Sequence, residues 1–383
     1  MDFHETTEHR ALRESVGAIT AGFGGAYFAR KAEARESTTE LWDALAANGF
    51  IGINVPEAYG GGGAGLVELA IVCEESAAQG CPLLLLLVAS AISAEVIATY
   101  GSEQQRKEWL PRLATGEGKI VFAITEPEAG SNTHRLATTA TRDGDSYLLR
   151  GQKYYISGVD EADAILVVAR TGTDERGNAT LSLFIVDTDA PGLVAQPLPV
   201  SVTLPERQFT VHFDDVRVAA DRLVGVEGEG FAQVFHGLNP ERITGAAVCV
   251  GIGRYALNRA AEYASNRVVW DRPIGAHQGV SHVLAKAKIE VELAALMTAR
   301  AAWLHDNGEP AGEAANMAKY AAAEAALAAV DGAIQCHGGN GLATEYGLLP
   351  LWGLARLLRI APVNREMILN YVAQHSLHLP RSY

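Results

Sequence analysis

A segment in the middle of the chain carries hydroxyl groups where an apolar run gives way to a turn. It reads Phe122-Ala-Ile-Thr-Glu-Pro-Glu-Ala-Gly-Ser131-Asn132. Pro127 and Gly130 predict a turn after a strand. The hydroxyls of Thr125 and Ser131 could bind a ligand that comes close to the backbone. Taken alone, the segment also fits an ordinary turn at the end of a strand.

A second segment places an aromatic ring beside a hydroxyl group. It reads Gly151-Gln-Lys-Tyr-Tyr155-Ile156-Ser157-Gly158. The ring could stack on a planar cofactor, and the hydroxyl could bond to a ring nitrogen of that cofactor. A plain strand with an exposed tyrosine fits this segment equally well.

The composition of the chain changes twice, which predicts the elements that must position these segments. Residues 1–116 and 227–383 have apolar residues at helical spacing, and residues 314–333 are rich in alanine. Residues 117–226 hold short apolar runs separated by Gly, Asp and Asn clusters. We therefore predict an α+β chain with an N-terminal helical domain, a middle antiparallel, barrel-like β domain and a C-terminal helical bundle.

Charge and cysteine usage exclude several classes of protein. A formal net charge of −14 argues against nucleic-acid binding. The four cysteines form no CxxC pair, and His375 and His378 lack a third ligand, so we expect no disulfide framework and no metal site.

The apolar run over residues 83–94 is too short to span a bilayer and predicts a buried helix. With no leader-like amino end, a cytoplasmic location is expected.

Two glycine patterns resemble dinucleotide-binding loops without the necessary context. Residues 60–65 match GxGxxG, and Gly251 with Gly253 matches a looser form. Neither lies in a strand–turn–helix unit followed by a parallel strand, so we interpret them as a loop and as close helix packing.

Five motifs in order give the chain a resemblance to a known family. The two segments above are similar to the TEPxAGS and K-x-W/Y-I-T/S signatures of the acyl-CoA dehydrogenases. The resemblance continues over essentially the whole chain at Pro56-Glu57-Ala58-Tyr59-Gly60-Gly61, at residues 266–278, and at Gln335-Cys336-His337-Gly338-Gly339-Asn340-Gly341.

The resemblance implies an FAD held between the β domain and the C-terminal helices. Ser157 would bond near the reactive flavin nitrogen, and Trp270 would replace the usual stacking ring. Asp271 stands where the family has glycine, which brings a negative charge near the pyrophosphate. Gln335 and the glycines after it would reach the flavin of a neighbouring subunit, so a homotetramer is implied. The residues assigned to the cofactor are Phe122, Ile124, Thr125, Ser131, Tyr155, Ile156, Ser157, Arg267, Trp270, His277, Gln278, Gln335, Gly338, Gly339, Asn364 and Glu366.

The resemblance also implies a catalytic base. Most relatives carry a glutamate near the carboxyl end, where this chain has Pro362. A subgroup similar to isovaleryl-CoA and long-chain dehydrogenases carries it on a helix before an arginine, which here is Glu241. We expect Pro240 in the first turn of that helix and Glu241 in the field of its amino-terminal dipole. Asn239, Arg242 and Ser131 would contact the substrate.

The implied reaction is the FAD-dependent α,β-dehydrogenation of an acyl-CoA thioester to the trans-2-enoyl-CoA, as in fatty acid β-oxidation. Electrons would pass to electron-transfer flavoprotein. Proline at 362 has no N–H for the thioester oxygen, although the family uses the N–H at this position. The alternative functions are a flavin oxidase or monooxygenase of the same fold, and a non-catalytic flavoprotein subunit.

Overall fold

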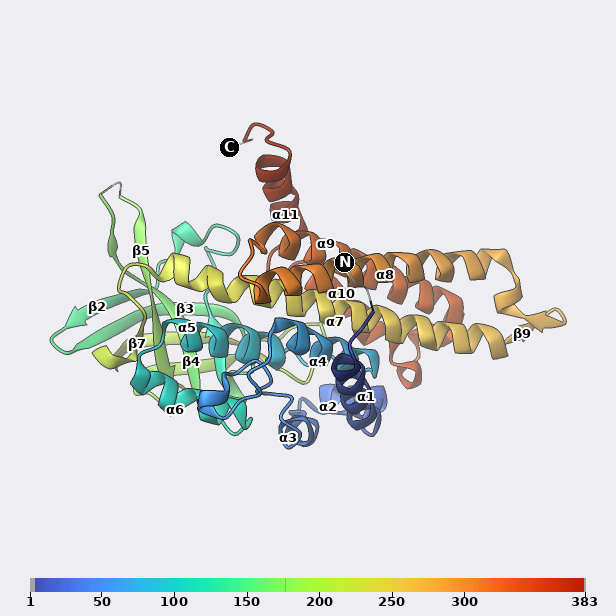
Figure 1. Ribbon diagram of the computed structural model, residues 1–383, viewed down its shortest axis with the longest axis horizontal. Coiled ribbons are helices and arrows are strands. Elements are labelled where there is room, and N and C mark those ends of the chain that lie inside the picture. The colour runs from blue at the N-terminus through green and yellow to red at the C-terminus, as the bar shows by residue number, and fades with distance from the viewer. Residues whose placement is uncertain (1–3, 176, 382–383) are drawn as a thin grey trace.

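The computed structural model describes residues 4–175 and 177–381. A β-sheet occupies one end of the molecule, long helices extend away from it, and shorter helices of the N-terminal part lie along one side (Figure 1). The N-terminal elements are α1 (Thr7–Ala21), α2 (Gly24–Ala34), α3 (Thr39–Ala46), α4 (Leu66–Ala78), the π-helix η2 (Leu86–Ala94), α5 (Glu95–Tyr100) and α6 (Glu103–Ala114). The predicted order of helices, sheet and helices is confirmed.

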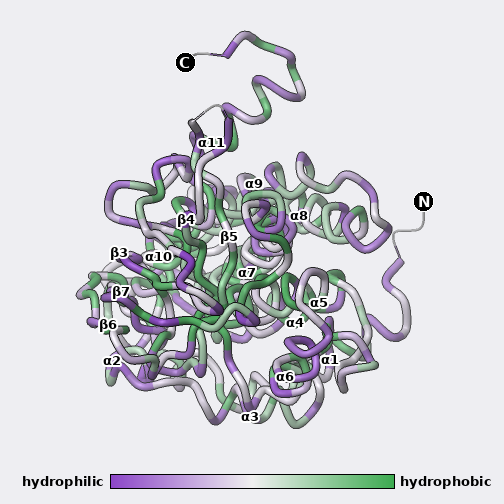
Figure 2. Tube along the Cα trace, turned by 90° about the vertical axis from the view of Figure 1, so that its left-hand side faces the viewer, coloured by the Kyte–Doolittle hydropathy of each residue, from purple (hydrophilic) through white to green (hydrophobic). Residues whose placement is uncertain are grey.

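The middle of the chain forms an eight-stranded sheet. Its order is β6-β7-β3-β2-β4-β5-β8, and β1 pairs with β4. The strands are β1 (Ile120–Ala123), β2 (Thr139–Asp143), β3 (Ser146–Ser157), β4 (Ala164–Thr173), β5 (Ala179–Asp187), β6 (Leu193–Pro197), β7 (Gln208–Ala219) and β8 (Leu223–Val224). In a view from the sheet end, β4 and β5 run through the hydrophobic centre (Figure 2).

The sheet is antiparallel except along one edge of β4. Residues 120–123 of β1 pair in parallel with residues 164–167, and Thr139 of β2 pairs in parallel with Arg170. β1 and β2 therefore form one interrupted line along β4, because residues 124–138 leave the sheet between them. The segment of residues 122–132, with Thr125 and Ser131, runs from the end of β1 into this excursion.

The C-terminal part is an antiparallel helical bundle. It consists of α7 (Gly230–Asn266), the hairpin β9 (Val268–Val269) and β10 (Arg272–Pro273), α8 (Gln278–Asp306), α9 (Gly312–His337), α10 (Leu348–Leu358), α11 (Arg365–Tyr371) and the π-helix η9 (Val372–Ser376). The last two elements stand out from the body, next to the carboxyl end (Figure 1). The alanines of α9 are buried inside this bundle, so small residues allow α7, α8 and α9 to approach closely.

The apolar run over residues 83–94 is buried, as predicted, but most of it is a π-helix. Within the described residues, no helix is both long enough and apolar enough to span a bilayer. The four cysteines are unpaired.

The second glycine pattern supports close helix packing, as interpreted from the sequence. A Cβ atom on Gly251 of α7 would lie 2.2 Å from the Glu74 carbonyl oxygen and 2.6 Å from the Ala77 Cβ. Both atoms belong to α4, so glycine is needed where the N-terminal helices cross α7.

We predict that Gly251→Ala lowers the stability of the protein. The added methyl group forces α4 and α7 apart, and overpacking of this kind costs about 1–3 kcal/mol. Thermal melting should show a clear decrease in Tm. Gly279→Ala is the matched control, because a Cβ atom there meets nothing within 4 Å. Equal melting of the two variants would contradict this account of the helix crossing.

Candidate active site

A buried ion pair closes the excursion of residues 124–138. The ammonium of Lys153, fully buried on β3, donates to Glu126 Oε1 at 2.8 Å and to the Ile124 carbonyl at 3.0 Å. The carboxylate of Glu126 also accepts from the backbone N–H groups of Ala137, at 2.6 Å, and Thr138, at 3.0 Å. One carboxylate therefore holds both ends of the excursion, and the turn with Ser131 is exposed between them.

A bulge at the end of β3 brings the second segment against the first. The β3–β7 register shifts between Lys153 and Ile156, and Tyr155 inside the bulge has a φ of 58°. A bulky residue in this conformation is strained, which is typical of functional sites. The Tyr154 N–H donates to the Thr125 carbonyl at 2.8 Å, so the two segments are joined directly.

The bulge decides which side chains are available to a ligand. Tyr155 is 54% exposed, Ser157 is half-buried, and the Ser157 hydroxyl contacts the amide of Gln208 on β7. Phe122 and Ile156, which the sequence also suggested, belong to the hydrophobic core. The side chains of Phe122 and Ile156 are therefore turned into the core and not toward the exposed surface.

Glu241 lies inside α7, not at its start. The helix begins at Gly230, so the expectation that Pro240 occupies the first turn is wrong. The dipole of the helix start therefore does not act on Glu241 as expected, because that effect is confined to the first turn. Pro240 instead lacks an N–H in mid-helix, which leaves the His236 carbonyl without its helical donor.

Burial gives Glu241 the properties of a base. Desolvation raises its pKa to about 7, while the positive charges of Arg242 and Lys319 act in the opposite direction. Among the described residues, none donates a hydrogen bond to this carboxylate or pairs with it in a salt bridge. A carboxyl group that titrates near neutral pH and has no partner is suited to exchange protons with a ligand.

The position of Pro362 is close to Glu241 in space. A Cβ atom on Gly245, one helical turn after Glu241, would lie 3.6 Å from Leu87 and 3.9 Å from the Pro362 ring. The carbonyl of Val363 accepts a hydrogen bond from the buried ammonium of Lys319 on α9. Positions 241 and 362, at which members of the family carry the base, thus lie next to each other. Of these two positions, only Glu241 has a carboxylate.

Other residues predicted for the site also meet. The Asn364 side chain caps α11 through the Met367 N–H and donates to Ser131 Oγ at 2.7 Å. Asn239 Oδ1 accepts from Arg242 Nη1 at 2.6 Å. Arg242 is buried, and its Nε atom has no partner in the structure. Glu366 is exposed in the first turn of α11.

A second group of predicted residues lies at the opposite end of the bundle. Its members border the β9–β10 hairpin or the end of α9, and the hairpin is the part farthest from the sheet (Figure 1). From Glu241 to the end of α7 the helix rises roughly 38 Å. The expectation that one chain brings His277 and Gln278 to the same cofactor as Thr125 and Ser157 is therefore not met. The group comprises Arg267, Trp270, His277, Gln278, Gln335, Gly338 and Gly339.

The hairpin explains the unusual Asp271. Trp270 and Asp271 both have positive φ, of 49° and 74°, at its two-residue tip. Such turns favour asparagine, aspartate and glycine, so the aspartate satisfies a backbone requirement. Trp270 is 82% exposed, and its ring lies edge-on to the His277 ring with the centroids 6.2 Å apart. The Nε2 atom of His277 is buried without a partner.

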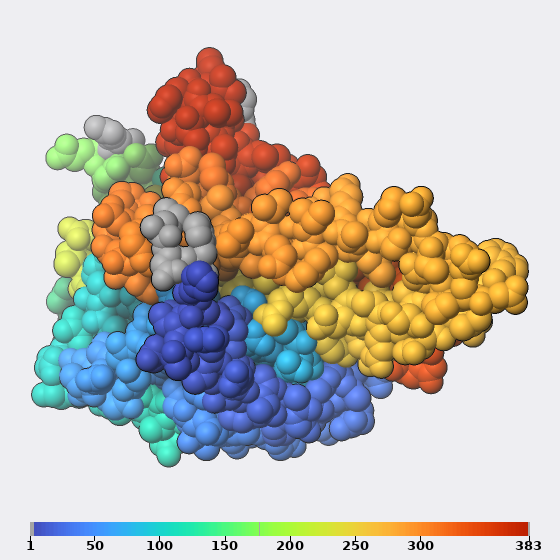
Figure 3. Space-filling view, turned by 45° about the vertical axis from the view of Figure 1, so that its right-hand side comes forward, coloured from blue at the N-terminus to red at the C-terminus, as the bar shows by residue number. Residues whose placement is uncertain are grey.

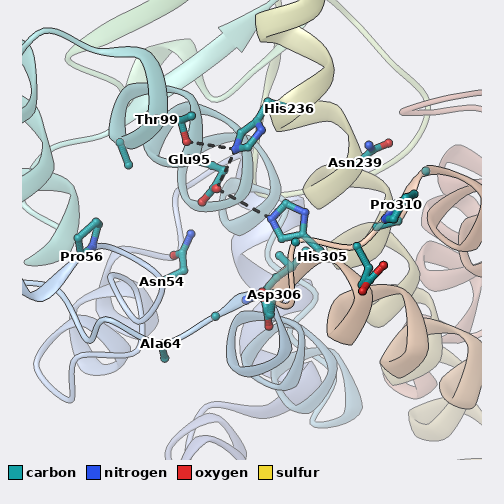
Figure 4. A pocket seen from close by; sticks show the side chains of 17 residues that line it. Asn54, Pro56, Ala64, Glu95, Thr99, His236, Asn239, His305, Asp306 and Pro310 are labelled. Atoms are coloured by element: carbon teal, nitrogen blue, oxygen red, sulfur yellow. Dashed lines mark hydrogen bonds and ion pairs between the residues drawn. The ribbon is translucent and has the colours of Figure 1, made fainter.

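A polar pocket of about 760 Å³ lies beside α7 and is separate from this arrangement. In it Glu95 faces two imidazoles, with His236 Nε2 at 3.2 Å and His305 Nε2 at 3.9 Å from the carboxylate (Figure 4). Of the predicted site residues only Asn239 lines the pocket. No three metal-ligating side chains of the described residues are arranged to hold a metal ion.

Sequence reasoning missed the residues that support the site. Lys153 and Glu126 stood inside the two motifs, but nothing in either segment indicated that they pair. Lys319 is hidden in an alanine-rich helix, where a single lysine gives no indication of burial. Gln208 lies far from Ser157 in sequence and became visible only through strand pairing.

Comparison with known proteins agrees with the observed order of domains. Three acyl-CoA dehydrogenase family models match, for the N-terminal domain (residues 6–117), the middle domain (121–216) and the C-terminal domain (228–377). The chain is 54% identical over 383 residues to acyl-CoA dehydrogenase FadE12 of Mycobacterium tuberculosis, covering 100% of this chain and 99% of that protein.

Solved structures are similar over the same length. The complex of glutaryl-coenzyme A dehydrogenase with glutaryl-CoA superimposes with a TM-score of 0.95 at 29% identity, covering 100% of this chain and 98% of the other. A glutaryl-CoA dehydrogenase from Mycobacterium smegmatis, in complex with FADH2, gives 0.92 at 25% identity, covering 99% and 96%. The chain belongs to the acyl-CoA dehydrogenase family.

Proposed function

We propose that the protein is an FAD-dependent acyl-CoA dehydrogenase that converts an acyl-CoA thioester to the trans-2-enoyl-CoA, with Glu241 as the base. The observation that carries this proposal is the half-buried, unpartnered carboxylate of Glu241, whose pKa desolvation raises to about 7. A base with a pKa close to the working pH combines a useful ionised fraction with a real affinity for the proton. In this reaction Glu241 removes the α proton of the acyl chain.

The cofactor site is proposed to form where the two segments meet. Ile124, Thr125, Tyr155 and Ser157 surround the exposed face of the bulge, and the excursion offers Ser131. FAD bound there would accept the β hydrogen as a hydride. Support comes from the strained Tyr155 and from the similar structure that holds FADH2.

Substrate contacts are proposed for Asn239, Arg242 and Ser131. The orphaned Nε of Arg242 is a donor that a thioester or its pantetheine amides could use. Pro362 cannot donate to the thioester oxygen, so polarisation of the carbonyl depends on other donors. The acyl chain would lie along the buried π-helix η2, whose Leu87 borders the Gly245 and Pro362 contact.

The distant group of residues is proposed to complete the cofactor site of a second copy. Large apolar side chains of α8, namely Ile289, Leu293, Leu296 and Trp303, are each more than half exposed. An exposed apolar stripe of this kind marks a protein interface. The arm that bears it, with residues from about 260 to 300, projects from the body in yellow and orange (Figure 3). We propose a homotetramer held together through α8.

Electron-transfer flavoprotein is the proposed electron acceptor, and fatty acid β-oxidation in the cytoplasm is the proposed setting. Four unpaired cysteines fit a reducing compartment. A flavin oxidase of the same fold is the alternative enzyme. Oxygen consumption during turnover separates the two.

We predict that Glu241→Gln retains FAD and acyl-CoA binding but loses proton abstraction. Flavin reduction by substrate, followed by stopped-flow absorbance without oxygen, should slow by about 10²–10⁴-fold. Glu313→Gln, an exposed glutamate in the first turn of α9, is the control and should behave as the parent protein. Prompt bleaching of the Glu241→Gln flavin would overturn the assignment of the base.

The pH dependence follows from the charges around Glu241. Only the carboxylate accepts a proton, so the rate of flavin reduction should fall as the pH drops below about 7. Lys319 lowers the pKa of Glu241, so in Lys319→Met the decrease in rate at acid pH should begin at a higher pH. Lys319→Arg retains the charge and serves as the control. A profile for Lys319→Met that is unchanged, or displaced to lower pH, would contradict the electrostatic argument.

We predict that Leu293→Glu combined with Leu296→Glu dissociates the oligomer, because a buried charge without a partner is strongly unfavourable. Sedimentation velocity should show smaller species, and FAD should be lost with them. Val194→Glu, which adds the same charge at an exposed apolar position of β6, is the control. A parent protein that sediments as an FAD-loaded monomer would rule out the proposed assembly.

A further inference from the structure

The last residue pair of the β3–β7 ladder joins a hydroxyl to a buried amide. Ser157 and Gln208 are direct cross-strand partners. Gln208 Nε2 lies 2.9 Å from Ser157 Oγ, and Ser157 Oγ lies 3.1 Å from Gln208 Oε1. Gln208 is buried, whereas Ser157 is only half-buried at the edge of the bulge. The amide therefore contacts the inner side of a hydroxyl whose outer side is accessible.

We propose that Gln208 is a positioning residue that holds the Ser157 hydroxyl for the flavin. The inference rests on the proposed function, which places Ser157 at the cofactor. A hydroxyl has a single proton and two acceptor lone pairs. When the Gln208 Nε2 group donates to Oγ, the proton of Ser157 is free to point at the cofactor. In the absence of the cofactor, the Ser157 hydroxyl can instead donate to Gln208 Oε1.

Donation by the amide also makes the hydroxyl a better donor. Hydrogen bonds in a chain polarise one another, so a hydroxyl that accepts a bond donates more strongly. An amide is suited to this role because it presents a donor and an acceptor side by side. A leucine at 208 would leave the hydroxyl free to rotate away.

The segment that carries Gln208 is held firmly at several points. Leu198 N–H donates to the Gln208 carbonyl at 2.7 Å, and Gly158 N–H donates to the Arg207 carbonyl at 2.9 Å. Glu206, buried two residues earlier, accepts from the Leu84 N–H at 2.8 Å. Its other carboxylate oxygen has no partner, a costly arrangement in a buried group. The backbone that carries the amide is thus held in place before any cofactor binds.

The same contacts connect the hydroxyl to the residues before η2. Leu84 is bound by Glu206, and the side chain of Leu85 packs at Gly158, where a Cβ atom would lie 2.7 Å from Leu85 Cδ2. Ser157, Gln208 and the residues that lead into η2 therefore form one packed unit. The position of the hydroxyl depends on this unit as well as on β3.

A double-mutant cycle tests the proposal on the FAD-loaded protein. The variants are Gln208→Leu, Ser157→Ala and the combination, with Gln196→Leu on the exposed part of β6 as control. FAD content, Tm and the visible absorption spectrum of the bound flavin are recorded without substrate. Flavin reduction by substrate is then followed in a single turnover.

The expected result is that Gln208→Leu retains FAD and reproduces the spectral change of Ser157→Ala. It should also slow flavin reduction by roughly three- to tenfold, the worth of one hydrogen bond. In the Ser157→Ala background the second substitution should add almost nothing. If Gln208→Leu does not fold, Gln208→Glu replaces the donor by an acceptor of the same shape and should produce the same change.

Two outcomes would overturn the inference. One is a Gln208 variant with the parent spectrum and rate while Ser157→Ala is impaired. The other is an equal effect of Gln208→Leu with and without Ser157. If Ser157→Ala itself leaves the flavin spectrum unchanged, Ser157 does not contact the flavin, and both this inference and the proposed placement of the cofactor fail. The assignment of Glu241 as the base would be unaffected by any of these results.

Discussion

The buried ion pair of Lys153 and Glu126 is the interaction on which the site depends. Burial lowers the pKa of Lys153 to about 8, and the adjacent carboxylate counteracts this effect. Loss of either partner would leave an uncompensated buried charge, at a cost of about 3–5 kcal/mol. Because Glu126 also binds both ends of the excursion, the pair lets residues 124–138 leave the sheet without separating β1 from β2. The exposed turn is therefore anchored to the sheet at both ends of the excursion.

Strain elsewhere in the site is tolerated because the adjoining segments are anchored in this way. Tyr155 has an unfavourable backbone conformation, which costs of the order of 1–3 kcal/mol. Its neighbours on both sides are held, by Lys153 in the core and by the pairing of Ser157 with Gln208. The bulge thereby turns one aromatic ring out of the sheet while Ile156 remains in the core.

The sequence predicted the three-part fold because apolar periodicity records which face of each element is buried. It also located the two segments, since turn residues and hydroxyls stand out locally. It failed at Pro240, because proline is common in first turns, although Phe231, Val234, Phe235 and Leu238 already stand at helical spacing before it. It could not find Gln208, Lys319 or the Glu126–Lys153 pair, because their partners are distant in sequence. Burial of single polar groups is a tertiary property that one sequence does not reveal.

The position of Glu241 in mid-helix changes the physical explanation of its reactivity. At a helix start, the dipole would stabilise the carboxylate and make it a weaker base. In the interior of α7 that stabilisation is absent, and desolvation raises the pKa instead. Lys319 and Arg242 limit the increase, so the group titrates near neutrality instead of remaining permanently protonated. Lys319 also holds the Val363 carbonyl next to Pro362. The buried ammonium of Lys319 thus acts on the charge of Glu241 and also binds the segment around Pro362, where most relatives carry their base.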